Sequence, residues 1–275
     1  MTGNGYLDVM GIEKVIQAYS SFGYQVLLSN PDCLPTRLAK DGRPLQISYA
    51  ISLTDILLFQ WIAGSAPWRR ALVIGNAFGF STFVIAALCP SSLVDVIDAE
   101  IEGIENGTGS DLTRKIAKEF FPSVQLTKGF SPQDLHKACR FKEYDFIFID
   151  GMHTDDQLIK DFEGIRDRRS RNSAVYCHDV GMARMHKAWS YIKSNCLDAE
   201  DSPFDLHFSN FGCTVVLKGH PRLCALLKQT SLPLKDCYFY FGSKHAGLRT
   251  AGRMVWRTFR HSSRVGPALC NFLHL

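Results

Sequence analysis

The sequence contains no apolar run long enough to cross a membrane. Its uninterrupted apolar stretches fall short of the roughly 18 residues that a membrane-spanning helix needs. The first thirty residues also lack the basic segment followed by an apolar segment that marks a secretory signal. These absences argue against an integral membrane or secreted protein, and we expect a cytoplasmic one.

Paired cysteine motifs are absent as well. The nine cysteines are an odd number, scattered from Cys33 to Cys270, with no CxxC pair and no histidine at zinc-finger spacing. This pattern argues against a disulfide framework and against a structural zinc site. We expect reduced thiols that are mostly buried.

Internal repeats and low-complexity tracts are also missing, and the composition is that of a folded protein. Of the 275 residues, 46% are hydrophobic and 21% are charged, which suits one catalytic domain with extensions. We predict a helical and loop extension over residues 1–50, serving as a substrate lid or in oligomerisation. A catalytic domain over 51–219 and a basic helical extension over 220–275 follow it.

The central segment alternates strand and helix signals. Strands are expected at 71–74, 93–97, 124–126, 144–149 and 174–177, and helices at 81–88, 111–120, 132–139, 155–166 and 185–195. Two later strands, at 204–208 and 213–217, flank a turn and predict an antiparallel pair. The fold class is therefore α/β, with a Rossmann-like, doubly wound, mostly parallel sheet and an antiparallel C-terminal edge hairpin. Its site is expected at the C-terminal ends of the parallel strands.

The segment before this alternation predicts two helices and little sheet. The helices are expected at 7–21 and 52–63, with a short strand at 23–29 and a loop at 33–46. Ser52 or Thr54 is expected to cap the second helix, which should pack in the core.

A glycine-rich turn joins the first central strand to its helix, with the pattern Gly75-x-x-x-Gly79-x-Ser81-Thr82. Glycine at such a junction lets a ligand approach the backbone and lets the helix pack closely on the sheet. The next strand ends in Asp98, whose carboxylate can accept hydrogen bonds from both hydroxyls of a ribose, with Glu100 as the alternative. The two features together favour a cofactor that contains adenosine. The missing G-x-G-x-x-G spacing argues against a nicotinamide-dependent oxidoreductase.

Six motifs in order along residues 51–219 resemble those of class I S-adenosylmethionine-dependent methyltransferases, particularly the small-molecule O-methyltransferase-like families. They are IGNAFGFST, Asp98, GFSPQDL, FIDGMHTDDQLIKDF, HDV and FGCTVVL. The resemblance implies that the glycine loop holds the amino acid end of the cofactor, through Gly75, Asn76, Ala77, Gly79 and Ser81. It further implies that Asp98 binds the ribose and that Phe130 and Ser131 lie at the adenine.

The chain departs from these families at one position. They usually carry an acid two residues before the first glycine, which orders the loop or reaches the methionine ammonium group, and this chain has Val73 there. Asp150, at a neighbouring strand end, is expected to compensate as a cofactor-binding residue. The alternative is a non-catalytic or weakly active binding protein that keeps the fold and uses its basic tail.

Four polar residues are expected to converge over the crevice: Asp150, His153, His178 and Asp179. Two chemistries fit them. In one, Asp150 and Asp179 supply oxygen ligands to Mg²⁺, which lowers the pKa of a substrate hydroxyl. In the other, His153 or His178 takes the proton directly. We expect catalytic roles for His153, His178 and Asp179.

The expected acceptor is a small molecule, in the first place a hydroxyl, with nitrogen and carbon acceptors also open. The net charge of +4 is concentrated at the end of the chain, where residues 221–275 hold nine Lys or Arg and a single acid, Asp236. The tail arginines recur along one helical face: Arg249, Arg253, Arg257, Arg260 and Arg264. Because the opposite side is apolar, we expect the tail to dock on the domain or on a second subunit, as in a homo-oligomer, and not on nucleic acid.

Overall fold

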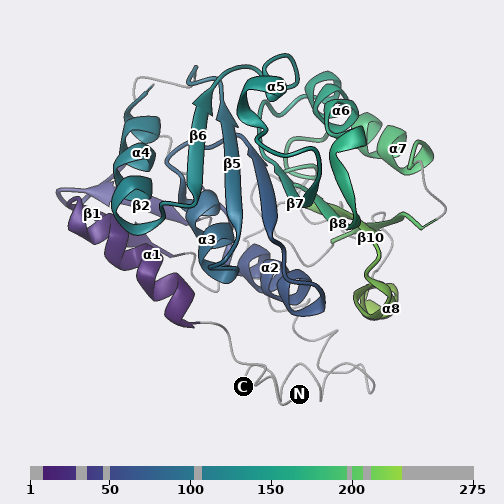
Figure 1. Cartoon of the computed structure of the whole chain (residues 1–275), viewed down its shortest axis with the longest axis horizontal. Coiled ribbons are helices and arrows are strands. Elements are labelled where there is room, and N and C mark those ends of the chain that lie inside the picture. The colour runs from purple at the N-terminus through teal and green to yellow at the C-terminus, as the bar shows by residue number, and fades with distance from the viewer. Residues whose placement is uncertain are drawn as a thin grey trace, which may run out of the picture.

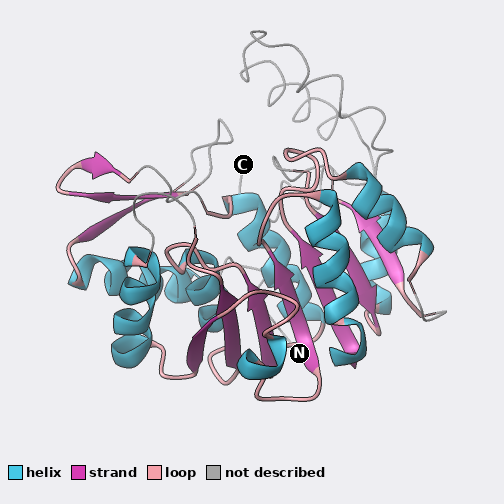
Figure 2. Cartoon of the chain, turned by 90° about the horizontal axis from the view of Figure 1, so that it is seen from above, coloured by secondary structure: helices cyan, strands magenta, loops and turns pink. Residues whose placement is uncertain are grey.

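The computed structural model describes residues 9–28, 36–45, 50–101, 107–196, 200–206 and 212–230. In this part of the chain a seven-stranded sheet lies between two layers of helices (Figure 1). A three-stranded antiparallel sheet stands beside it (Figure 2). None of the helices described has the length and apolar character of a membrane-spanning segment. The arginines of the predicted tail helix lie outside the described residues.

The main sheet has the strand order β6-β5-β4-β7-β8-β10-β9. Its parallel strands are β4 (Arg70–Ile74), β5 (Leu93–Asp98), β6 (Val124–Lys128), β7 (Tyr144–Ile149) and β8 (Arg169–Cys177). The antiparallel members are β10 (Thr214–Lys218) and β9 (Ser202–Asp205). The predicted fold class is confirmed, including the antiparallel terminal pair. Along the chain, β5 and β6 are added on one side of β4, and β7 and β8 are then added on its other side. The point where the order of strands reverses in this way is where α/β sheets bind ligands.

Helices cover both faces of this sheet because its strands are apolar on both faces. Successive residues of β7 alternate between them: Phe146 and Phe148 join one core, and Ile147 and Ile149 the other. The first core packs against α1 (Val9–Ser21), α2 (Leu53–Ser65), α3 (Phe80–Leu88), α4 (Thr108–Phe120) and α8 (Pro221–Thr230). The second packs against α5 (Leu135–Ala138), α6 (Asp155–Gly164) and α7 (His186–Ser194).

Two predicted helices are shorter in the structure than the sequence indicated. The helix predicted at 132–139 is only α5, because the Asp134 carboxylate accepts a hydrogen bond from the Phe130 N–H at 2.9 Å and closes a turn before the helix begins. The helix predicted at 155–166 ends at Gly164, and a short 3₁₀ turn, Arg166–Arg168, follows it.

The expectation of a loop over 33–46 is wrong for its described part. Residues 36–45 contain β2 (Arg37–Lys40) and β3 (Arg43–Pro44), which pair with β1 (Tyr24–Leu27) in the small sheet. Between β2 and β3, Asp41 and Gly42 both have positive φ, 50° and 72°. Asp-Gly is the dipeptide that favours this kind of two-residue hairpin turn, so the sequence carried a signal for it.

The helix α2 begins with a capping box at Ser52. The Ser52 hydroxyl accepts a hydrogen bond from the Asp55 N–H, and the Asp55 carboxylate accepts one from the Ser52 N–H. This settles the choice between Ser52 and Thr54 as the cap.

We expect the substitution Ser52→Ala to lower the free energy of unfolding by about 1 to 2 kcal/mol, because it removes a buried cap. Urea denaturation of the whole chain measures it. Thr54→Ala is the matched control, which makes no cap and should change stability by less than about 0.5 kcal/mol. Equal losses from both substitutions would contradict the assignment of the cap.

Candidate active site

The glycine loop connects β4 to α3, and its two glycines are required by the packing of the chain on itself. Gly75 has φ +91°, and a Cβ there would lie 2.0 Å from the carbonyl oxygen of Asp150. Gly79 has φ +82°, and its Cβ would lie 2.4 Å from the hydroxyl of Thr113 in α4. Any side chain at either position would therefore push the loop away from β7 or from α4.

Asn76 ties the loop together from inside. Its side-chain amide donates to the Ala77 carbonyl and to the Thr113 hydroxyl, both at 3.0 Å, and its side-chain oxygen accepts from Thr82 at 3.2 Å. Asn76 is buried, so these contacts are shielded from water. The protein's own hydrogen bonds therefore hold the shape of this loop.

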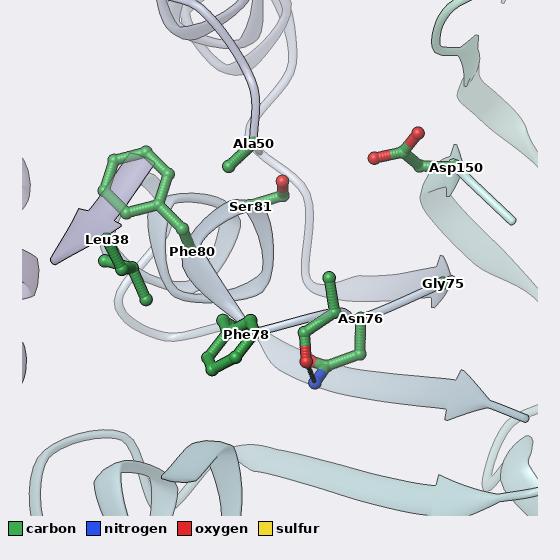
Figure 3. A pocket seen from close by; sticks show the side chains of 9 residues that line it. Leu38, Ala50, Gly75, Asn76, Phe78, Phe80, Ser81 and Asp150 are labelled. Carbon is green, nitrogen blue, oxygen red and sulfur yellow. Dashed lines mark hydrogen bonds between the residues drawn. The ribbon is translucent and has the colours of Figure 1, made fainter. Parts of the chain in front are cut away.

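A cavity runs along the loop (Figure 3). It is lined by Leu38, Ala50, Gly75, Asn76, Ala77, Phe78, Phe80, Ser81 and Asp150. All the glycine-loop residues predicted to bind the cofactor, except Gly79, line it, and so does Asp150. The sequence did not point to Leu38 and Ala50, which bring the N-terminal segment to the same cavity. A lid role for that segment stays a prediction.

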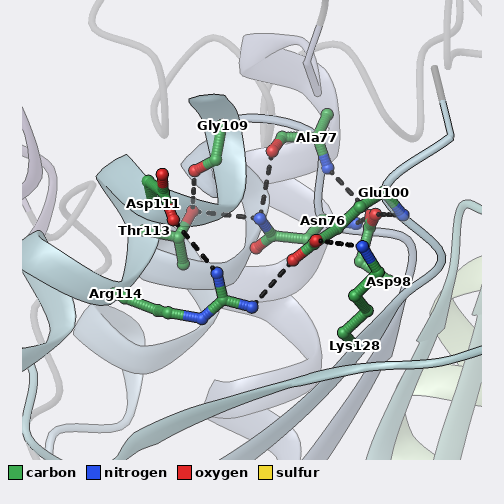
Figure 4. A network of polar contacts seen from close by, with 9 residues as sticks. All are labelled: Asn76, Ala77, Asp98, Glu100, Gly109, Asp111, Thr113, Arg114 and Lys128. Carbon is green, nitrogen blue, oxygen red and sulfur yellow. Dashed lines mark hydrogen bonds and ion pairs between the residues drawn. The ribbon is translucent and has the colours of Figure 1, made fainter. Parts of the chain in front are cut away.

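Asp98 holds the glycine loop by its backbone (Figure 4). One carboxylate oxygen, Oδ2, accepts from the Asn76 N–H at 2.6 Å and the Ala77 N–H at 3.3 Å, and Oδ1 accepts from the Glu100 N–H at 2.6 Å. The usual acid before the first glycine is absent, and the buried Val73 stands in its place. Asp98 orders the loop that this acid would otherwise order. A carboxylate has about four acceptor positions, so a ribose hydroxyl can still bind.

Glu100 is engaged with two cations. Its carboxylate lies 2.7 Å from Arg114 and 3.1 Å from Lys128 (Figure 4). Burial opposes the charge, but the hydrogen bonds from Arg114 and Lys128 lower the pKa of Glu100 below its ordinary value. Because these cations occupy Glu100, Asp98 is the better candidate for the ribose.

The predicted adenine residues lie on the loop between β6 and α5. Phe130 is exposed, and the Ser131 carbonyl accepts a hydrogen bond from the Gln157 side chain at 2.7 Å. The same Gln157 amide donates to the buried carboxyl of Asp161 at 2.9 Å, and burial raises the pKa of Asp161. Gln157 and Asp161 of α6 therefore anchor this loop, which the sequence did not reveal. The adenine role stays a prediction.

The four predicted acid and histidine residues meet, and we call them the acid–histidine cluster: Asp150, His153, His178 and Asp179. Asp150 Oδ1 lies 3.2 Å from His153 Nε2 and 3.2 Å from His178 Nδ1. Asp179 contacts His178 Nδ1 at 3.2 Å and His153 Nε2 at 3.6 Å. Asp150 follows β7, and His178 and Asp179 follow β8, so adjacent parallel strands deliver them to one edge.

The charges of this cluster support one another. Burial alone would lower the pKa of His178, but its interactions with Cys213, Asp150 and Asp179 raise that pKa well above the ordinary value. Burial alone would raise the pKa of Asp150, but the positive charge of His178 and the hydrogen bond from His153 lower it. The hydrogen bond to Asp150 raises the pKa of His153. The arrangement therefore favours an ionised Asp150 beside protonated His153 and His178.

Asp55 of α2 completes the surroundings of His178, and this contact was not predicted from the sequence. Burial would raise the pKa of Asp55, but the hydrogen bond and charge of His178 lower it to about 2. Ligand-type atoms of Asp55, His178 and Cys213 lie within 4.8 Å of one another. Donors from Ser52 and Tyr176 already occupy both oxygens of Asp55, which favours a hydrogen-bonded network over a metal site here.

The comparisons with known proteins match the central part of the chain to a methyltransferase domain. Residues 72–180 match the family described as a methyltransferase domain. No curated protein matches the sequence significantly. Among solved structures, the O-methyltransferase from Bacillus cereus in complex with S-adenosylhomocysteine superposes with a TM-score of 0.50 at 16% identity, covering 76% of this chain and 91% of that one. TomG, an O-methyltransferase from Streptomyces achromogenes involved in tomaymycin synthesis and bound to S-adenosylmethionine, gives 0.50 at 17% identity, covering 76% and 89%.

At these identities the solved structures support the fold alone, and the domain match concerns residues 72–180. The matched residues begin within β4, contain the glycine loop and Asp98, and end just after Asp179. They therefore include the glycine loop, Asp98 and the acid–histidine cluster, whereas Leu38, Ala50 and Asp55 lie before them. Residues 72–180 therefore match a methyltransferase domain, and the fold around them is that of the solved methyltransferases.

Proposed function

We propose that the enzyme transfers the methyl group of S-adenosylmethionine to a hydroxyl group of a small molecule at the acid–histidine cluster. The observation that carries this proposal is the position of Asp150. It lines the cavity along the glycine loop and also a second cavity, shared with His153, His178 and Met185. A methyl donor held by the loop and an acceptor whose hydroxyl reaches the second cavity would meet beside this carboxylate.

The residues present fit a divalent cation. Asp150, His153 and Asp179 each offer a ligand atom, all within 4.8 Å of one another. Carboxylate oxygens are the ligands that Mg²⁺ prefers, so Asp150 and Asp179 would hold it, with His153 at its side. A bound Mg²⁺ would lower the pKa of an acceptor hydroxyl.

The protein's own residues would align the methyl group with the acceptor oxygen and carry away the proton of the acceptor hydroxyl. The sulfonium already activates the methyl group, so holding it in line with the acceptor oxygen supplies much of the rate. The glycine loop, fixed by Asp98 and Asn76, would hold the donor. His153 is the most exposed member of the cluster, with 40% of its side chain accessible, and it can pass a proton to solvent.

The two solved structures support a hydroxyl acceptor, because both are O-methyltransferases. One of them is described as acting in the synthesis of a small molecule, tomaymycin. Hard oxygen ligands beside the donor suit the same class of acceptor.

The test is transfer from methyl-labelled S-adenosylmethionine to a panel of catechols, phenols, aliphatic alcohols and amines, with Mg²⁺ or with EDTA. We expect labelled methyl ethers, with EDTA lowering the rate by about 100-fold or more, as loss of a hydroxyl-activating cation should. Ether formation that survives EDTA would replace the cation with a histidine base. Transfer to amines alone would overturn the proposed acceptor.

A further inference from the structure

Positive side chains gather at the edge of the main sheet opposite the candidate active site. The parallel strands begin at this edge, and β10 runs antiparallel to them and ends there. The helix α8 follows β10 after two residues and lies at the lower end of the sheet in Figure 1. Neighbouring strands are about 4.8 Å apart, so the row from β4 to β10 spans about 15 Å. Its six cations, which we call the basic edge, are Arg69, Arg70, Lys142, Arg171, Lys218 and Arg222.

Contacts between the strands join these positions into one surface. The Asp145 carboxylate accepts hydrogen bonds from the Arg69 N–H and from the Ser170 hydroxyl, both at 2.9 Å, so the starts of β4 and β8 are linked. A Cβ on Gly219 would lie 2.8 Å from the carbonyl oxygen of Arg171, so the end of β10 touches the start of β8. The basic edge is therefore continuous from β4 to α8.

Acids neutralise little of this charge. Five of the six cations are exposed, and within the described part of the chain none of these five forms an ion pair. The Asp145 carboxylate is engaged by N–H and hydroxyl donors, and the buried Asp95 is paired with Arg140. A surface with an excess of one charge attracts partners of the opposite charge. The exposed acids beside the six cations are Glu143, Asp167 and Glu200.

Apolar side chains are exposed among these cations. Leu93, the first residue of β5, is 39% exposed, and its N–H donates to the Arg69 carbonyl at 2.8 Å. Leu226 is 40% exposed on α8, one turn after Arg222. Nucleic acid backbones are bound mainly through charge and would leave these leucines in water. An anionic lipid surface binds cations and apolar side chains together.

The sequence that continues from α8 adds charge of the same sign. Residues 231–275 lie outside the described part of the chain, and they hold seven Lys or Arg and one acid, Asp236. A tail that docks through its apolar side, as predicted from the sequence, would leave its arginine face open to the same anionic partner. The charge of the tail therefore favours the partner that the basic edge fits.

We infer that the basic edge binds the surface of an anionic lipid membrane, with the candidate active site turned away from the lipid. A Lys or Arg close to such a surface strengthens binding by about fivefold, so a row of six supports reversible attachment. The inference is independent of the proposed function, because the six cations line neither cavity and lie outside the acid–histidine cluster.

Sedimentation of the intact chain with large vesicles tests this inference. Vesicles of phosphatidylcholine and phosphatidylserine in a ratio of about 7:3 are compared with vesicles of phosphatidylcholine alone, at about 0.05 and 0.2 M salt. We expect saturable binding to the anionic vesicles, weakened about tenfold or more at the higher salt, and no binding to the neutral vesicles. Equal binding to both kinds of vesicle would overturn the inference.

The double variant Arg70→Gln/Arg171→Gln removes two charges from the basic edge. We expect it to bind the anionic vesicles about 25-fold more weakly. The Arg70 N–H that Asp145 accepts is retained in glutamine, so the strand starts stay linked. If this variant does not fold, Arg171→Gln/Arg222→Gln tests the same surface.

Lys160→Gln/Lys187→Gln is the matched control, because it removes two exposed charges from α6 and α7, which do not reach the basic edge. Its affinity for the vesicles should change by less than about threefold. Equal affinities of the natural chain and the basic-edge variant would overturn the inference. A DNA duplex that binds more tightly than the vesicles, and is lost in the same variant, would also overturn it and make nucleic acid the partner.

Discussion

Asp98→Ala is expected to weaken the binding of S-adenosylhomocysteine by about 100-fold, since hydrogen bonds to a charged group contribute about 1.5 to 3 kcal/mol each. Two losses combine in this variant. The ribose loses its acceptor, and the N–H groups of Asn76 and Ala77 lose the carboxylate that holds the glycine loop. Isothermal titration calorimetry measures the affinity, and thermal melting should show a lower Tm even without the ligand.

Glu100→Gln is the matched control for this prediction. It alters a carboxylate two residues away that is already engaged with Arg114 and Lys128. We expect its affinity for S-adenosylhomocysteine to change by less than about threefold, as for a partly exposed ion pair. If Glu100→Gln is the more damaging of the two, the ribose role belongs to Glu100.

Asp179→Asn is expected to lower turnover on a hydroxyl acceptor by about 100-fold or more, and to weaken Mn²⁺ binding by a similar factor. Asp179 has φ +55°, a conformation that asparagine tolerates, so the change removes the charge without straining the backbone. Asp179 does not line the cavity along the glycine loop, and the affinity for S-adenosylhomocysteine should hold.

Asp156→Asn removes an equal charge from the exposed first turn of α6, and serves as the control. Electron paramagnetic resonance of Mn²⁺ and a steady-state methyl-transfer assay give the two readouts. Full turnover in Asp179→Asn, together with unchanged Mn²⁺ affinity, would remove Asp179 from the site and favour a histidine base.

The sequence predicted most of the main sheet because burial on both faces leaves continuous apolar strands. The bounds of β7 match the prediction, and the acids and histidines at strand ends came together because parallel strands end at one edge. The hairpin at Asp41 and Gly42 was missed although its dipeptide signals a turn, since the flanking strands are too short to show alternation.

The partners of the site residues could not be predicted in the same way. Asp55 and Tyr176 are 121 residues apart, and only the packing of α2 on β8 brings them together. Asp55 also fits the pattern of a capping box, which conceals its contact with His178. Asp98 was predicted to bind a ribose. Its hydrogen bond from the Asn76 N–H in the glycine loop could not be predicted, because it depends on the distance between the ends of β4 and β5.

Calorimetric titration of the intact chain with S-adenosylhomocysteine, alongside NAD⁺, tests the proposed methyltransferase function most directly. We predict saturable binding of S-adenosylhomocysteine at one site per chain with a dissociation constant of about 1 to 100 μM, the range of about −8 to −5.5 kcal/mol, and no binding of NAD⁺. Binding of NAD⁺ with no heat from S-adenosylhomocysteine would contradict it.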